Sequence, residues 1–246
     1  MDKVIVCKNL TKQFGDFIAV DKISFEVNAG EIFGFLGANG AGKTTAMRML
    51  CGLSYPTSGE GTVAGYNVYK QQELIKKNIG YMSQKFSLYE NLTIHENIEF
   101  YGGVYGLSDK QLKQKSSELI SKLGLEKESR KMVGELPLGW KQKLAFSVAV
   151  IHQPKIVFLD EPTGGVDPVT RRQFWDLIYD ASDSGITIFV TTHYMDEAEY
   201  CNRISIMVDG RMDALDTPSN LKQKYAAQTM DEVFYALARG AQRSDN

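Results

Sequence analysis

A glycine-rich loop at residues 37–44 restricts the fold of this chain more than any other segment does. The loop reads Gly-Ala-Asn-Gly-Ala-Gly-Lys-Thr and matches the pattern G-x-x-x-x-G-K-[ST]; it follows a β-rich apolar run (residues 32–36) and opens a helical pattern. In that context backbone amides converge on an anion, and the helix N-terminus adds a favourable dipole. The segment therefore predicts a strand, a phosphate-binding loop and a helix within an α/β fold.

The pattern predicts distinct roles for the polar residues of this loop in binding phosphate groups. Lys43 is placed to hold the β- and γ-phosphates, and the Thr44 hydroxyl is placed to bind Mg²⁺, a hard cation that prefers oxygen ligands. A ligand-free turn is the alternative, but it leaves both residues unexplained at this spacing. The expected ATP-binding residues of the loop are Gly37, Ala38, Asn39, Gly40, Ala41, Gly42, Lys43, Thr44 and Thr45.

Polar residues also follow the next apolar runs along the chain. Asp160 and Glu161 end the run at 156–159, and a buried strand that ends in two carboxylates is costly unless a cation or a reaction uses them. We expect Asp160 to bind Mg²⁺, directly or through water, and Glu161 to take a proton from the attacking water. His193 follows a further run, so it is expected at the same edge of the sheet, where α/β folds bind ligands.

The pattern of hydrophobic residues changes along the chain. Residues 1–36 read as short β-rich runs separated by turns, whereas residues 88–152 read as helical, with capping-box pairs at Thr93/Glu96 and Ser108/Gln111. The strand at 156–159, a helix opened by Asp167-Pro168 and the next strand imply a parallel sheet. We therefore expect a helical lobe inserted into an α/β core.

Composition excludes several classes of function. The formal net charge is −2 and the basic residues are dispersed, so no nucleic-acid partner is expected. Cys7, Cys51 and Cys201 are few and widely spaced, which favours small core residues in a reducing compartment over a disulfide framework. No apolar run approaches the ~18 residues that span a bilayer, so a membrane role would require a partner.

In order and spacing, these motifs resemble the ATP-binding subunits of ATP-binding cassette (ABC) transporters. Gln84 matches the glutamine loop that senses Mg²⁺ and attacking water, and His193 matches the switch histidine that contacts the γ-phosphate. Asp167 lies where the family has its inter-subunit loop, and it can also serve as a helix N-cap. Phe14 occupies the position of the adenine-stacking aromatic; Phe17 is a nearby rival, and an ordinary strand-end phenylalanine is the alternative.

The resemblance implies a P-loop NTPase fold of the α/β class. Its RecA-like, mostly parallel sheet would carry an N-terminal antiparallel β subdomain and the helical lobe. The ABC ATPase domain would span residues 1–225, with the lobe at about 88–152, and a C-terminal helix, opened by Thr229/Glu232, and tail would span 226–246. The implied catalytic residues are Lys43, Gln84, Glu161 and His193, and the implied Mg²⁺ ligands are Thr44, Gln84 and Asp160.

One motif departs from the family. The signature Leu-Ser-Gly-Gly-Gln is replaced by Leu136-Pro137-Leu138-Gly139-Trp140, although the spacing downstream is retained. In the family the serine hydroxyl and glycine amides hold the γ-phosphate of the opposite subunit, and Pro137 has neither a hydroxyl nor an N–H. Gly139 and the following helix N-terminus can still attract phosphate, so slower hydrolysis or a rearranged contact is expected. Of the two roles open to Trp140, packing against the partner's nucleotide and filling a hydrophobic seam, the second is expected.

The resemblance also implies an assembly. Homo- or heterodimers would close head-to-tail around two Mg-ATP and drive a separate membrane permease from the cytoplasmic face. The altered signature and the segments 84–89 and 229–234 resemble the branch that serves drug, polysaccharide and lipid exporters. The competing functions are a soluble ABC-type ATPase, for example in cluster assembly, an ATP-binding regulatory subunit, and a P-loop kinase. The candidates for the groove that receives the permease, or for lobe core, are Phe86, Leu88, Tyr89, Phe100 and Tyr101.

Overall fold

The computed structural model describes residues 2–84 and 87–244, which form two sheets and the helices around them. The first sheet contains β1 (Lys3–Phe14), β2 (Phe17–Asn28), β4 (Ser58–Val63) and β5 (Tyr66–Asn67), in the order β2-β1-β4-β5. The second contains β3 (Ile32–Gly37), β6 (Ile79–Met82), β7 (Ile156–Asp160), β8 (Thr187–Thr192), β9 (Arg203–Val208) and β10 (Arg211–Asp216), in the order β10-β9-β3-β8-β7-β6.

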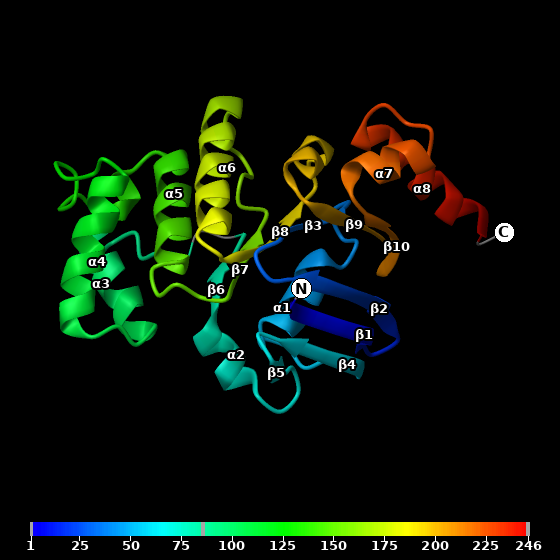
Figure 1. The fold of residues 1–246 in the computed structure, drawn as a ribbon, viewed down its shortest axis with the longest axis horizontal. Helices are drawn as coiled ribbons and strands as arrows, with labels where there is room; N and C mark the ends of the chain where they lie inside the picture. The colour runs from blue at the N-terminus through cyan, green and yellow to red at the C-terminus, as the bar shows by residue number, and fades with distance from the viewer. Residues whose placement is uncertain (1, 85–86, 245–246) are drawn as a thin grey trace.

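The helices divide into those around the sheets and those of an inserted lobe. The first group contains α1 (Lys43–Leu50), α2 (Gln72–Asn78), α6 (Pro168–Asp183), the 3-10 segment η2 (Met195–Tyr200), α7 (Pro218–Lys224) and α8 (Met230–Ser244). The lobe contains α3 (Ile94–Val104), α4 (Asp109–Lys122), the 3-10 segment η1 (Val133–Glu135) and α5 (Leu138–Ala149). Figure 1 shows α3, α4 and α5 gathered at one end of the molecule, beyond β6, with α7 and α8 near the other end.

The larger sheet is parallel except for its edge strand β10, which pairs antiparallel with β9. Successive residues of a strand point to opposite faces, and both faces are covered here: Phe33 and Phe35 pack into one core, whereas Ile32 and Leu36 pack into the other. This explains why the core strands read as continuous apolar runs. The mostly parallel core, the antiparallel N-terminal sheet and the helical lobe predicted from the sequence are confirmed.

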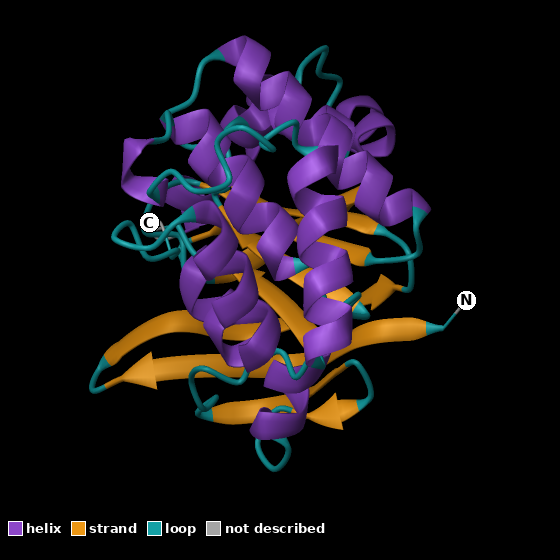
Figure 2. Cartoon of the chain, turned by 90° about the vertical axis from the view of Figure 1, so that its left-hand side faces the viewer, coloured by secondary structure: helices purple, strands orange, loops and turns teal. Residues whose placement is uncertain are grey.

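The N-terminal strands are longer than the short runs in the sequence suggest. β1 and β2 each span 12 residues and meet at the turn Gly15-Asp16. Their register shifts at several points, and Asn9 and Lys22 each have a φ of 49°. Such irregularities interrupt the alternation of apolar and polar residues, so one long strand reads as several pieces. In Figure 2 these long strands lie below the larger sheet.

Local helix signals predicted most helix starts correctly. The capping boxes at Thr93/Glu96 and Ser108/Gln111 are both present, and Asp167 caps α6 by accepting hydrogen bonds from the amides of Val169 and Thr170. Only one of the two hydrogen bonds of the capping box predicted at Thr229/Glu232 is present: the Glu232 amide donates to Thr229 Oγ1. The Glu232 carboxylate accepts from the amide of Gln228 instead of the amide of Thr229, so the second half of the prediction is wrong. The short helices α2 and α7 were not predicted.

Two further expectations concern cysteines and membrane spans. Cys7, Cys51 and Cys201 are free and buried, as expected for core residues. Among the residues described by the structure, no helix combines the length and the apolar character that crossing a bilayer requires.

Candidate functional site

The predicted site residues follow neighbouring strands at one edge of the larger sheet. In the strand register Leu36 lies opposite Thr192, Asp160 lies opposite Thr191, and Met82 lies opposite Leu159. The carboxyl ends of β3, β8, β7 and β6 are therefore level. The segments that follow them carry the glycine-rich loop, His193, Glu161 and Gln84, so the parallel sheet brings together motifs that are far apart in the sequence.

The glycine-rich loop wraps around the ammonium group of Lys43. The Lys43 side chain is only 4% exposed, and its Nζ donates to the carbonyl oxygens of Gly37 (2.8 Å) and Ala38 (3.1 Å). Gly42 has a φ of 101°, and a Cβ there would lie 2.3 Å from the carbonyl oxygen of Ala19, so only glycine fits at this position. α1 begins at Lys43, which turns the helix N-terminus toward the loop.

A cavity of ≈ 280 Å³ lies over this loop. The loop contributes Asn39, Gly40, Gly42, Lys43, Thr44 and Thr45, and the other lining residues are Phe17, Ala19, Gln84 and Glu161. The cavity thus joins the predicted phosphate-binding residues to predicted catalytic residues of two other strands.

The buried carboxylate of Asp160 is paired with two hydroxyl groups. Thr191 Oγ1 donates to Asp160 Oδ1 at 2.7 Å, and Thr44 Oγ1 donates to the same oxygen at 3.1 Å. Burial raises the pKa of Asp160 and the charge of Glu161 adds to the rise, while the hydrogen bonds from Thr191 and Thr44 and the charge of Lys43 oppose it. A cation at this carboxylate would favour its ionised form, so the charge balance fits a metal ion.

The donor set also fits Mg²⁺. Hydroxyl and carboxylate oxygens are its usual protein ligands, and Mg²⁺ takes its other ligands from phosphate oxygens and water. No group of three or more His, Cys, Asp or Glu side chains that could hold a metal by itself is found in residues 2–84 and 87–244. The cation would therefore be bound jointly with a phosphate ligand, at Thr44 and Asp160.

The carboxylate of Glu161 is the point where the other predicted residues meet. Its Oε2 accepts a hydrogen bond from Gln84 Nε2 at 2.9 Å and lies 3.0 Å from His193 Nδ1, while its Oε1 lies 3.4 Å from Lys43 Nζ. The Glu161 backbone has a φ of 49°, which is uncommon for a residue with a side chain, and its amide donates to Thr191 O and Oγ1. This strained turn points the carboxylate toward the loop instead of along the strand.

The aromatic residue at the cavity is not the one expected first. Phe17 lines the cavity, whereas Phe14, its cross-strand neighbour on β1, is absent from the lining, and the Lys12 ammonium lies 4.8 Å from the centre of the Phe14 ring. The two residues flank the turn of one hairpin, so the sequence alone could not separate them. The rival residue, Phe17, is the better placed of the two.

The altered signature does not line this cavity, although Leu138 lines a smaller neighbouring cavity together with Gln84 and Glu161. Leu136 is buried, Pro137 is the N-cap of α5, and Pro137, Leu138, Gly139 and Trp140 line a second cavity of ≈ 340 Å³ together with the loop at 165–167. In the described part of the chain, no residue from 136–140 lines the cavity at the glycine-rich loop. Trp140 packs against the main hydrophobic core, as expected.

Two polar residues that organise the site, Thr191 and Gln142, were not predicted from the sequence. Thr191 binds both Asp160 and the Glu161 amide, and its only sequence signal is a small polar residue at the end of an apolar strand. Gln142, 8% exposed on α5, donates to the carbonyl oxygen of Gly164 at 3.1 Å and so links α5 to the loop that follows Glu161. No local pattern indicates that contact, because the partners are 22 residues apart.

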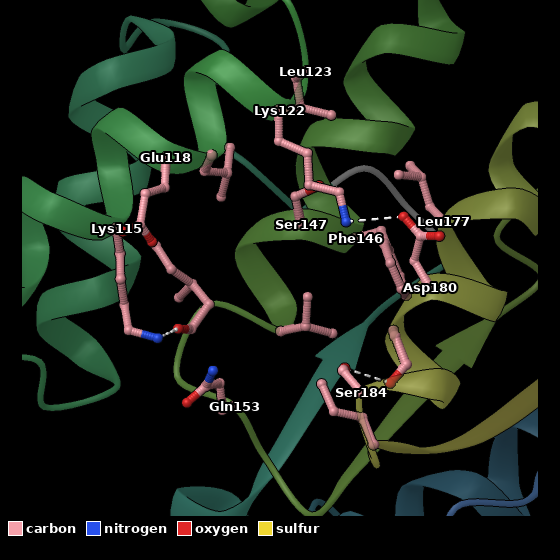
Figure 3. A pocket seen from close by; sticks show the side chains of 15 residues that line it. Lys115, Glu118, Lys122, Leu123, Phe146, Ser147, Gln153, Leu177, Asp180 and Ser184 are labelled. Atoms are coloured by element: carbon pink, nitrogen blue, oxygen red, sulfur yellow. Dashed lines mark hydrogen bonds and ion pairs between the residues drawn. The ribbon is translucent and has the colours of Figure 1, made fainter.

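A further cavity of ≈ 280 Å³ lies between α4, α5 and α6 (Figure 3). Lys122 of α4 reaches across to Asp180 of α6 at 3.0 Å, but both side chains are more than half exposed, and Lys115 donates to the carbonyl oxygen of Ile151. Exposed ion pairs of this kind contribute little to stability. Among the described residues that line it, this cavity has no counterpart of the cluster around Glu161, so the cavity at the glycine-rich loop is the candidate site.

Comparison with known proteins agrees with this assignment. Residues 20–164 match the family model described as ABC transporter. The probable multidrug ABC transporter ATP-binding protein YbhF of Escherichia coli is 47% identical over 241 residues, which are 96% of this chain but only 42% of that protein. The linearmycin resistance ATP-binding protein LnrL of Bacillus subtilis is 35% identical, over 94% of this chain and 74% of that protein.

Solved structures show the same fold. An ATP-binding subunit of an ABC transporter superposes with a TM-score of 0.85 and 25% identity, covering 95% of this chain and 99% of that one. A dimeric ATP-binding cassette in a post-hydrolysis state with ADP and Pi superposes with a TM-score of 0.77 and 25% identity, over 87% of this chain and 98% of that one. Fold, site geometry and sequence agree: the chain belongs to the ABC transporter family, as one of its ATP-binding members.

Proposed function

We propose that the chain is the ATP-hydrolysing subunit of an ABC exporter, which closes head-to-tail with a second subunit around two Mg-ATP. The observation that carries this proposal is the convergence of Gln84, His193 and Lys43 on the Glu161 carboxylate, beside the Thr44–Asp160 pair. A subunit that only binds ATP has no need of a general base held by three side chains. A relative named for Nod factor export, 37% identical to this chain, supports the export direction.

The residues divide the chemistry among them. Loop amides and Lys43 bind the β- and γ-phosphates, and bound Mg²⁺ supplies a positive charge that neutralises phosphate oxygens. Glu161 accepts a proton from water as the water oxygen bonds to the γ-phosphorus and the bond to the β–γ bridging oxygen breaks, which leaves ADP and inorganic phosphate. Because Nδ1 of His193 faces Glu161, its Nε2 is the nitrogen left to contact the γ-phosphate. Gln84 orients the carboxylate.

A membrane permease is the proposed partner, at the cytoplasmic face of the membrane. Tyr89 and Phe100 are 51% and 45% exposed, and with Tyr101 their ring centres lie 5.1–6.0 Å apart, so they form an exposed aromatic cluster at the start of the lobe. Such clusters are typical of protein interfaces. Of the other two candidates, Leu88 belongs to the core at 6% exposure, which is the alternative given for it, and Phe86 lies outside the described residues.

Steady-state ATP hydrolysis measured against protein concentration tests the proposal. In the wild type the activity is expected to rise more than linearly with concentration. In Glu161→Gln, loss of the general base should reduce turnover by about 100-fold or more, and ATP with Mg²⁺ should produce a dimer on size-exclusion chromatography.

Glu118→Gln, at an exposed position on α4, is the matched control and should behave as wild type. Linear activity in the wild type together with a monomeric Glu161→Gln in ATP would contradict the paired mechanism.

A further inference from the structure

The cavity at the start of α5 contains an ammonium group that the family resemblance does not explain. Lys143 lines this ≈ 340 Å³ cavity together with Pro137, Gly139 and the loop at 165–167. These residues include the segment that stands where the family has its signature, and Pro137 stands where the family has the serine that binds phosphate. The inference below rests on the proposed head-to-tail pairing and concerns which group takes over from that serine.

Helix geometry directs the Lys143 side chain toward the altered signature. Lys143 follows Trp140 by three residues and Gly139 by four, so the three share one face of α5, and helical side chains point back toward the N-terminus. Gly139 has no side chain to block this path. The ammonium lies 4.9 Å from the centre of the Trp140 ring and donates to Gln173 Oε1 of α6 at 2.6 Å.

The positive charge of Lys143 is not neutralised by a carboxylate. Within the described residues no acidic side chain comes within the 4.0 Å of an ion pair, and the partner amide of Gln173 is neutral. Asp167, the acidic residue of the cavity, already accepts hydrogen bonds from Val169 N, Thr170 N and Thr170 Oγ1. Burial lowers the pKa of Lys143 and the charge of Asp167 opposes this, which shows that the charged form is partly desolvated here.

A cation beside the N-terminus of a helix is disfavoured unless an anion joins it, because the helix dipole is positive at that end. The amides of Trp140 and Lys141 both donate to the carbonyl oxygen of Pro137, at 3.0 and 3.1 Å. The first turn of α5 therefore offers phosphate only the amides of Leu138 and Gly139. A single phosphate oxygen held by these amides would still lack the hydroxyl donor that the family's serine supplies.

We propose that Lys143 replaces the missing serine hydroxyl and binds the γ-phosphate of the ATP held by the partner subunit. The ligand class is the terminal phosphate of a nucleoside triphosphate. In this contact the ammonium exchanges the neutral amide of Gln173 for a phosphate oxygen, which is the stronger, charge-assisted hydrogen bond. Two equivalent contacts form in each dimer, so their effect on dimerisation is doubled in free energy.

The test uses the Glu161→Gln background, in which ATP is retained and the dimer accumulates. Sedimentation velocity in saturating ATP and Mg²⁺ gives the dissociation constant of the dimer. Lys143→Met, which retains the length of the stem, is expected to raise that constant by about 100-fold, since each charged hydrogen bond contributes about tenfold or more. Lys143→Arg should stay within about threefold of the parent, because the charge is kept.

Lys141→Met is the matched control on the same helix, because Lys141 points to Glu90 at 2.7 Å instead of into the cavity. It should leave the dimer unchanged. The affinity of the monomer for ATP, measured by calorimetry at low protein concentration, should be the same for all variants, because that ATP is bound by the loop of the same chain. If Lys143→Met does not fold, Lys143→Gln is judged by the same criterion.

A Lys143→Met dimer as tight as the parent overturns the proposal, and so does an equal loss in Lys143→Arg, which would indicate a packing role. If the proposed head-to-tail pairing were wrong, the result would differ from both of these outcomes, because the Glu161→Gln parent itself would then form no dimer in ATP.

Discussion

Replacing Gly139 with alanine would place a methyl group between α5 and α6. A Cβ at this position would lie 2.4 Å from Thr170 Cγ2, well inside van der Waals contact, and 3.4 Å from Thr170 Oγ1. Thr170 cannot rotate away freely, because its hydroxyl donates to Asp167 Oδ2 at 2.6 Å. The altered signature therefore retains this glycine position for a packing reason as well as for its amide.

Two opposing effects determine how Gly139→Ala changes the free energy of unfolding. Alanine at the second position of α5 would stabilise the helix relative to glycine by at most ~1 kcal/mol. The clash with Thr170 would cost about 1–3 kcal/mol, the range for inserting a methyl group into a packed site. With the full helix gain subtracted, Gly139→Ala should therefore lower the free energy of unfolding by up to about 2 kcal/mol.

The effect of Gly139→Ala on the free energy of unfolding should change sign when the clashing methyl group of Thr170 is removed. Thr170→Ser deletes Cγ2 and keeps the hydroxyl that binds Asp167, so in this background Gly139→Ala should be neutral or stabilising by up to ~1 kcal/mol. Urea denaturation of the four proteins, at a single pH and with m-values compared, measures the coupling. Free energies that add to within ~0.5 kcal/mol would refute the argument that Gly139 is required by its distance from Thr170.

Three further predictions concern the nucleotide cavity and the half-buried His152. Phe17→Ala should weaken ATP binding, measured by calorimetry, more than Phe14→Ala does, and the reverse order would return the adenine contact to Phe14. Thr44→Val should lower the apparent affinity for Mg²⁺ in the ATPase assay by about tenfold or more, because a hydroxyl ligand is lost; unchanged Mg²⁺ dependence would contradict this role. Burial lowers the pKa of His152 to about 4, so between pH 6.5 and 4 the unfolded chain binds a proton that the folded chain does not. The free energy of unfolding should fall as pH is lowered through that range, by no more than about 2 kcal/mol after solvent screening, and His152→Phe should lose this component in denaturation curves.

The sequence by itself determined the elements whose signals are local. The strand before the glycine-rich loop, the carboxylates at and directly after the end of β7 and the cap of α6 by Asp167 could all be predicted, because each depends on residues within a few positions of one another. The edge of the sheet at which the site lies could also be predicted from the sequence, since parallel strands present their carboxyl ends together. The lengths of β1 and β2 could not be predicted from the sequence, because bulges interrupt the alternation of apolar and polar residues that would reveal one long strand.

The tertiary structure decided which of the predicted groups touch. The left-handed backbone of Glu161 and the convergence of Gln84 and His193 on its carboxylate depend on three strands meeting, and the partners are separated by 77 and 32 residues. Contacts of this kind are set by the packing of the whole sheet, not by local propensity. The same holds for the choice of Phe17 over Phe14 at the cavity and for the unpaired charge of Lys143, which becomes visible only when α5, α6 and the loop at 165–167 are placed together.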